Sequence, residues 1–194
     1  MQYKRLFLAA VIGAICSFSA VLAADATRQT YAHAKAGLAK AKLSLAEAVD
    51  AALKKVPRGK AVEANLEHGT KATVFLIEVV SREKHLDVEI DSATGEVLGV
   101  EEEQEGTEEA KKGTDEPDDE ELENEAAERS KTSLAEAIRT AGKELQKGKP
   151  FAAAFERKEG KLVVKVELLN GDDVSVIDVD AETGKLLKVK NGGK

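Results

Sequence analysis

The sequence predicts an α+β protein built from two repeats, each with one helix packed on a four-stranded antiparallel meander sheet, joined by an acidic linker. Three observations support this fold class. The chain repeats itself at a constant offset. Each copy combines a capped amphipathic helix with four strand-like segments. A stretch rich in Glu and Asp separates the two copies.

The internal repeat is visible by direct alignment. One copy begins at Ser44 and reads SLAEAVDAALKKVPRGKAVEANLE; the other begins at Ser133 and reads SLAEAIRTAGKELQKGKPFAAAFE, so the offset is 89 residues (133 − 44). The same offset places Glu78 on Glu167 and continues through each copy without a gap. A gapless match over helix, strands and turns indicates duplication of one small unit.

Each copy opens with a helix signal. Ser44 and Glu47 have the spacing of a capping box, in which the Ser hydroxyl accepts from a backbone N–H and the Glu reaches back to the cap. Ser133 and Glu136 repeat this spacing. Pro and Gly residues then predict the end of each helix. The apolar residues at helical spacing are Leu45, Ala48, Val49, Ala52, Leu53 and Val56 in one copy, and Leu134, Ala137, Ile138, Ala141 and Leu145 in the other.

Strand signals follow each helix, because apolar and polar residues alternate over short segments. The sequence LNGD at 169–172 is typical of a tight turn between antiparallel strands. The alternating sets are Val62, Ala64 and Leu66; Phe75, Ile77 and Val79; Leu86, Val88 and Ile90; and 97–100 in the first copy. In the second they are Phe151, Ala153 and Phe155; Val164, Val166 and Leu168; Ile177 and Val179; and Leu186 and Val189.

An Asp before Thr-Gly occurs once in each copy, as DSATG from Asp91 and DAETG from Asp180. The pattern invites comparison with catalytic carboxylates, but the triplet Asp-Thr-Gly of aspartic proteases is absent. Asp favours turn starts because its side chain bonds nearby backbone N–H groups, and Gly supplies a positive φ. We therefore interpret both segments as structural turns between strands, and we expect no catalytic residues.

The predicted organisation has six parts. A basic start at Lys4 and Arg5, a short apolar run and small residues before Ala24 indicate a cleaved signal peptide; an uncleaved anchor and lipidation at Cys16 are the alternatives. The linker is too polar to bury a core, although a helix within it at 119–129 is compatible with its composition. The parts are a signal peptide at 1–23, an Ala- and Lys-rich leader at 24–43, repeat 1 at 44–101, a largely disordered acidic linker at 102–130, repeat 2 at 131–190 and a tail at 191–194.

Composition excludes several function classes. The formal net charge of −7 disfavours binding to nucleic acid or anionic lipid, because both would repel the chain. The histidines lack metal-ligand spacing, and His85 with Glu89 lies on a predicted strand, where such a pair is too far apart to share an ion. We expect surface histidines, no metal, no cofactor and no enzymatic activity.

Several of these patterns, in their order and spacing, resemble the PepSY domain. They are Ser-Leu-x-x-Ala-Ile/Val at the helix start, Gly-Lys before a strand, Phe-x-Ile-Glu-Val, and Val-x-Ile-Asp-x-x-Thr-Gly-x-Val-Leu, over about 44–101 and 133–190. The resemblance implies a small secreted or periplasmic module that binds or inhibits a peptidase, without catalytic residues. The tandem is also similar to the beta-lactamase inhibitor protein architecture, although the long acidic linker departs from a single fused sheet.

The sequence also predicts a partner surface. If Phe75, Ile77 and Val79 face the helix, alternate residues of that strand and of its counterpart in the second copy face outward, and five of these eight are apolar. Mutual covering by the two copies is the alternative. These residues are Val74, Leu76, Glu78, Val80, Val163, Lys165, Glu167 and Leu169. We expect a secreted or periplasmic peptidase as partner and no membrane contact after signal cleavage, and infer no oligomeric state. The alternative function is an acidic cell-envelope protein that sequesters cations through its linker.

Overall fold

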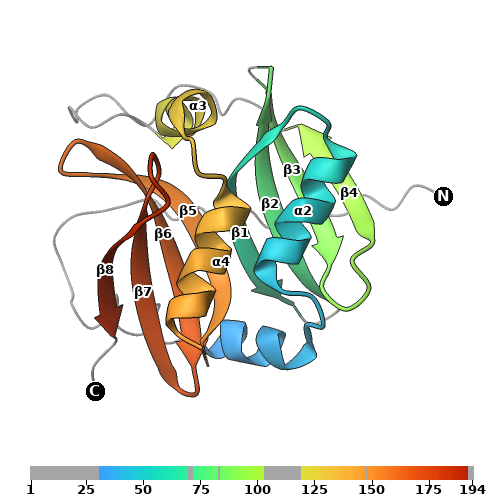
Figure 1. Ribbon diagram of the computed structural model, residues 1–194. Helices are drawn as coiled ribbons and strands as arrows, with labels where there is room; N and C mark the ends of the chain where they lie inside the picture. The colour runs from blue at the N-terminus through green and yellow to red at the C-terminus, as the bar shows by residue number, and fades with distance from the viewer. Residues whose placement is uncertain (1–30, 70–71, 83, 103–118, 147, 192–194) are drawn as a thin grey trace, which may run out of the picture.

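The computed structural model describes residues 31–69, 72–82, 84–102, 119–146 and 148–191. The described part forms one layer of helices on one face of a sheet, with two further helices at opposite ends of the strands (Figure 1). The elements are a helix at 31–40, α2 (Leu45–Lys55), β1 (Lys60–His68), β2 (Thr73–Ser81), β3 (Lys84–Asp91), β4 (Val97–Glu102), α3 (Asp119–Arg129), α4 (Leu134–Glu144), β5 (Lys149–Lys158), β6 (Lys161–Asn170), β7 (Asp173–Asp180) and β8 (Leu186–Asn191).

Both predicted capping boxes are present. The Glu47 N–H donates to Ser44 Oγ at 3.3 Å, and the Ser44 N–H donates to Glu47 Oε2 at 2.8 Å. Ser133 and Glu136 repeat the arrangement at 3.3 and 3.0 Å. Each box satisfies backbone donors that have no partner inside the helix, so α2 and α4 begin where the sequence predicted.

The strands form one eight-stranded antiparallel sheet in the order β4-β3-β2-β1-β5-β6-β7-β8. The four-stranded meander predicted for each repeat is confirmed, but the expectation of separate sheets is wrong. The repeats join where β1 pairs with β5, with Ala64 opposite Ala153. In two separate sheets β1 and β5 would each expose an unpaired edge, and pairing removes both edges. The small residues at this seam leave room for α2 and α4 to lie side by side above it (Figure 1).

This topology also explains why the repeats need a long connection. The last strand of repeat 1, β4, lies at the outer edge of the sheet, whereas repeat 2 begins at the centre with α4 and β5. The chain must return from β4 to β5 across four strand spacings, about 19 Å at about 4.8 Å each. A long linker is therefore compatible with a fused sheet, contrary to the expectation from its length.

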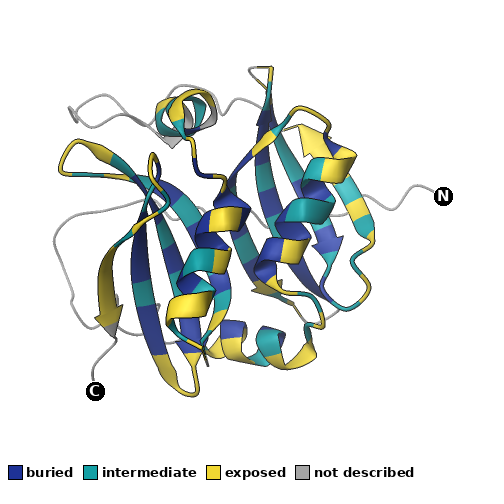
Figure 2. Ribbon diagram, viewed as in Figure 1, coloured by how far each residue is buried: buried dark blue, intermediate teal, exposed yellow. Residues whose placement is uncertain are grey.

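The core lies between the helix pair and the sheet, as the buried positions in Figure 2 show. Equivalent positions of the two repeats fill it, and each is at most 2% exposed. Burial of such side chains contributes about 1.5–3 kcal/mol each to folding. The core residues include Leu45, Val49, Phe75, Ile77, Val79, Val88 and Ile90 in repeat 1, and Leu134, Ile138, Val164, Val166, Leu168, Ile177 and Val179 in repeat 2.

Two helices outside the repeats cover the ends of the strands. The helix at 31–40 lies within the predicted leader and continues through Gly37. A Cβ on Gly37 would lie 3.1 Å from a Leu66 methyl carbon, so glycine permits a close approach to β1. Tyr31 on this helix packs edge-on against Phe151, with ring centroids 6.1 Å apart. The helix that the sequence allowed at 119–129 is present as α3, and it packs on β1, β2 and β5.

The two Asp-x-x-Thr-Gly segments are structural turns, as predicted. Asp91 Oδ1 accepts hydrogen bonds from the Ala93 and Thr94 N–H groups, at 2.9 and 2.7 Å, and from the Thr94 hydroxyl at 2.9 Å. Asp180 accepts the equivalent three bonds. These bonds lower the pKa of both carboxyl groups. Gly95 has φ +76°, which a side chain would strain.

Candidate partner-binding face and its surroundings

The sheet has one face covered by α2 and α4 and an opposite face, which we name the outer face. Because side chains alternate along a strand, residues between the buried core positions of β2 and β6 point to the outer face. The structure therefore places the predicted partner residues on that face. Their exposure divides them into two groups. Leu76, Glu78, Lys165 and Glu167 are partly exposed, whereas Val74, Val80, Val163 and Leu169 are buried.

The partly exposed group lies at the middle of β2 and β6, and the buried group lies toward the strand ends. Because a buried side chain offers little area to a partner, the middle of these strands is the accessible part of the predicted site. We name its four residues the outer-face centre: Leu76, Glu78, Lys165 and Glu167. They combine one apolar, one basic and two acidic side chains. The role of these residues in binding stays a prediction.

Ion pairs order the outer face of repeat 2. Lys158 Nζ lies 3.1 Å from Glu156 Oε2 and also contacts Asp178, whose side chain is only 8% exposed. Lys165 pairs with Glu156 and lies 3.6 Å from Glu167. Burial raises the pKa of Glu156, but the hydrogen bonds and charges of the two lysines outweigh burial, so the pKa is lowered. The resulting network keeps the Glu156 carboxylate ionised and fixes the Lys165 side chain.

A second charged group lies at the end of the outer face in repeat 1. His85 Nδ1 lies 2.9 Å from Glu78 Oε1 and 2.9 Å from Glu123 Oε2. These residues come from β3, β2 and α3, so the group links α3 to the sheet. His85 is only 9% exposed, and its Nε2 atom is buried without a hydrogen-bond partner in the described chain. The expectation of a surface histidine is therefore wrong for His85.

Sequence reasoning missed this group because its members are separated by 7 and 38 residues. Glu89, four residues after His85 on β3, is not a member of this group. The useful signal was the hairpin register, since Val80 opposite His85 places Glu78 diagonally across from the ring. No comparable signal predicted that α3 would bring Glu123 to the same point.

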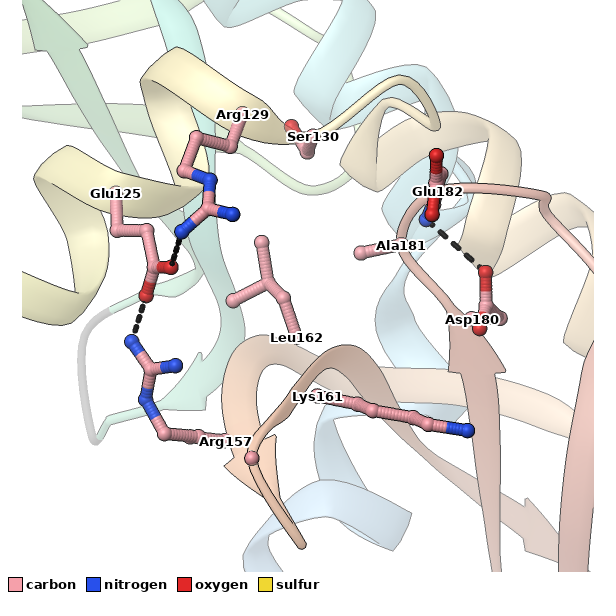
Figure 3. Close-up of a pocket in the computed structure, with 10 residues that line it drawn as sticks. Glu125, Arg129, Ser130, Arg157, Lys161, Leu162, Asp180, Ala181 and Glu182 are labelled. Atoms are coloured by element: carbon pink, nitrogen blue, oxygen red, sulfur yellow. Dashed lines mark hydrogen bonds and ion pairs between the residues drawn. The ribbon is translucent and has the colours of Figure 1, made fainter.

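A polar cleft of about 580 Å³ lies between α3 and repeat 2. Figure 3 shows Glu125 of α3 between two guanidinium groups, those of Arg129 and Arg157. Asp180 and Glu182 of the second Asp-x-x-Thr-Gly turn line the other side. Charged groups of both signs are already paired across this cleft. The arrangement stabilises the position of α3, and the sequence did not predict it.

Comparison with known families identifies the repeats. The PepSY model, described as peptidase propeptide and YPEB domain, matches residues 42–101 and again residues 131–190, which together make up more than half of the chain. The chain belongs to the PepSY family. The resemblance inferred from the sequence is therefore confirmed as a tandem of PepSY domains. This family is generally non-catalytic, and membership supports a non-enzymatic module.

Two solved structures are similar to the chain. A Clostridium difficile 630 protein assigned as a lipoprotein has 19% identity and a TM-score of 0.44, and the match covers 78% of this chain and 94% of that one. The YpeB C-terminal domain of Bacillus megaterium has 16% identity and a TM-score of 0.28, with 80% and 68% covered. No curated protein matches. Neither likeness is close enough to transfer residue roles.

The predicted signal peptide at 1–23, most of the acidic linker and the end of the tail lie outside the described residues. Within the described ranges, no helix has the length and apolar character needed to cross a membrane.

Proposed function

We propose that this tandem PepSY protein binds a secreted or periplasmic peptidase through the outer face of its sheet, as an inhibitor or folding partner. The observation that carries the proposal is family membership of both repeats, since the family is described by peptidase propeptides. The fused sheet adds support, because it joins the outer faces of both repeats into one surface. The proposed contact is the outer-face centre together with its flanking strands.

The charge pattern of this surface limits the kind of partner. Lys165 is held by Glu156 and Glu167, so it is presented in a fixed position rather than as a free cation. Leu76, at the equivalent position of repeat 1 (76 + 89 = 165), offers apolar area instead. A partner that covers both positions would bury the apolar side chain of Leu76 and would contact the ordered ionic network around Lys165. Such mixed surfaces are usual for non-obligate protein interfaces.

The proposal is tested by capture from culture-fluid and cell-envelope fractions, using the full chain and its Leu76→Asp variant as baits. We expect the wild-type bait to retain a peptidase whose activity changes on binding, and the variant to retain at least about 10-fold less, as loss of a central hot-spot contact costs about 2 kcal/mol or more. Leu98→Asp is the matched control, because Leu98 is an exposed Leu on edge strand β4.

Two results would count against this function. One is equal retention of every partner by both Asp variants, provided that circular dichroism shows both to be folded. The other is that no peptidase is retained by the wild-type chain. In that case cation sequestration by the acidic linker, the alternative function, would be tested next by cation titration of the full chain. In the described part of that linker, Glu123 and Glu125 already contact His85 and Arg157.

A further inference from the structure

The group formed by Glu78, His85 and Glu123 has a feature that ordinary salt bridges lack. Both carboxylates approach the same ring nitrogen, Nδ1, at 2.9 Å. This nitrogen carries at most one hydrogen and cannot donate a full hydrogen bond to each. The three ligand atoms lie within 4.8 Å of one another. Two carboxylates held this close repel each other unless a positive charge lies between them.

A single hydrogen on Nδ1 can serve only one of the two carboxylates fully, so the ring alone does not hold this pair of acidic groups together. A divalent cation at Nδ1 supplies two charges and replaces the shared hydrogen bond with three coordination bonds.

We infer that Glu78, His85 and Glu123 form a site for one divalent transition-metal ion, with Zn²⁺ as the representative. One imidazole nitrogen and two carboxylate oxygens are ligands that Zn²⁺ accepts, at about 2.0–2.2 Å from the metal. Donor atoms that surround such an ion lie about 3 Å or more apart, so the distances of 2.9 Å require only a small adjustment. Water would complete the coordination shell. The inference does not depend on the proposed peptidase binding.

The site has a structural consequence, because its third ligand comes from α3. Among the described side chains of this helix Ala126 is buried, and Glu125 forms an ion pair with Arg157 of β5. A metal bound by Glu123 would pin α3 to β2 and β3. It would thereby stabilise the cleft between α3 and repeat 2. The ring lacks an acceptor on Nε2 of the kind that usually orients metal-bound histidine, so we expect modest rather than very tight affinity.

Calorimetric titration of the metal-free full chain with Zn²⁺ tests the inference. We expect one equivalent to bind more tightly than the loose association with the acidic linker. Binding should weaken at least about 10-fold in Glu78→Gln, His85→Asn and Glu123→Gln, since even outer-shell changes cost about 10–100-fold. Glu89→Gln is the matched control. Glu89 lies on the same face of β3, and the substitution removes the same charge.

A measurement on the unmodified chain guards against variants that fail to fold. In ¹⁵N-edited spectra of the imidazole groups, one equivalent of Zn²⁺ should shift the nitrogen signals of His85 and leave those of His33 and His68 unchanged. Amide exchange in α3 should slow in the same sample. The inference is overturned if the His85 signals do not shift, if Zn²⁺ affinity is the same in His85→Asn and Glu89→Gln, or if the wild-type chain shows no single tighter step.

Discussion

The two repeats share one face and differ on the other. On the face toward the helices, equivalent positions remain apolar, as Ile77 and Val166 illustrate (77 + 89 = 166). On the outer face, His85 of repeat 1 corresponds to Val174 of repeat 2 (85 + 89 = 174). The core constrains the helix-facing positions because every strand packs there, whereas outer positions are free to acquire different partners. The outer face is therefore where the two copies have specialised.

Equivalent residues of the two repeats also meet where the repeats join. The antiparallel pairing of β1 with β5 brings equivalent residues of the two copies together, such as Ala64 and Ala153. On the helix layer the equivalent residues Asp50 and Arg139 form an ion pair (50 + 89 = 139). Identical copies would place like charges opposite each other at such a position. Divergence to opposite charges removes that repulsion, although an exposed pair contributes only about 0–1 kcal/mol.

The largest expected effect comes from the shared core. Ile77→Ala should lower the free energy of unfolding by about 2–5 kcal/mol, because it leaves a cavity in a fully buried site. Since one sheet joins the repeats, amide signals from both should disappear in a single denaturant transition. Val166→Ala is the control in repeat 2. It should also unfold in a single transition, with a smaller decrease in the free energy of unfolding. Independent unfolding of the two repeats in either variant would contradict the fused sheet.

A smaller effect is expected from the ionic network on the outer face of repeat 2. Lys158→Met should destabilise the chain by about 1–3 kcal/mol, because Asp178 would keep a buried charge after losing its lysine. Lys185→Met, at an exposed position of the turn before β8, is the charge-matched control and should change stability by less than about 0.5 kcal/mol. Urea denaturation measures both. Equal losses of stability in the two variants would show that the ion pair between Lys158 and Asp178 adds nothing beyond the removal of one positive charge.

The smallest effect is expected where the repeats are most alike, in their turns. Asp91→Asn and Asp180→Asn should each cost about 1 kcal/mol, the usual cost of losing a side-chain cap on backbone N–H groups. Hydrogen bonding lowers the pKa of both carboxyl groups in the folded chain, so their contribution is full above their ordinary pKa near 4 and is lost as pH falls through the lowered values. Thermal unfolding between pH 2 and 6 should therefore fall less steeply on acidification in the double variant. An unchanged slope would refute this assignment.

The sequence predicted the local structure well because its signals are local. The capping boxes at Ser44 and Ser133, the alternating strands and the turn after Asp91 all depend on residues within one element. The pairing of β1 with β5 was missed because no short motif records which strands of two repeats become neighbours. The group around His85 was missed for the same reason, since Glu123 reaches it only after α3 packs on the sheet.

Hydrogen exchange of the full chain, with and without the captured peptidase, tests the central claim most directly. Binding is expected to slow exchange in β2 and β6 around 74–80 and 163–169 and to leave α2 and α4 unchanged. Protection confined to α2 and α4, with no change on these strands, would show that the partner binds the helix layer and would contradict binding through the outer face.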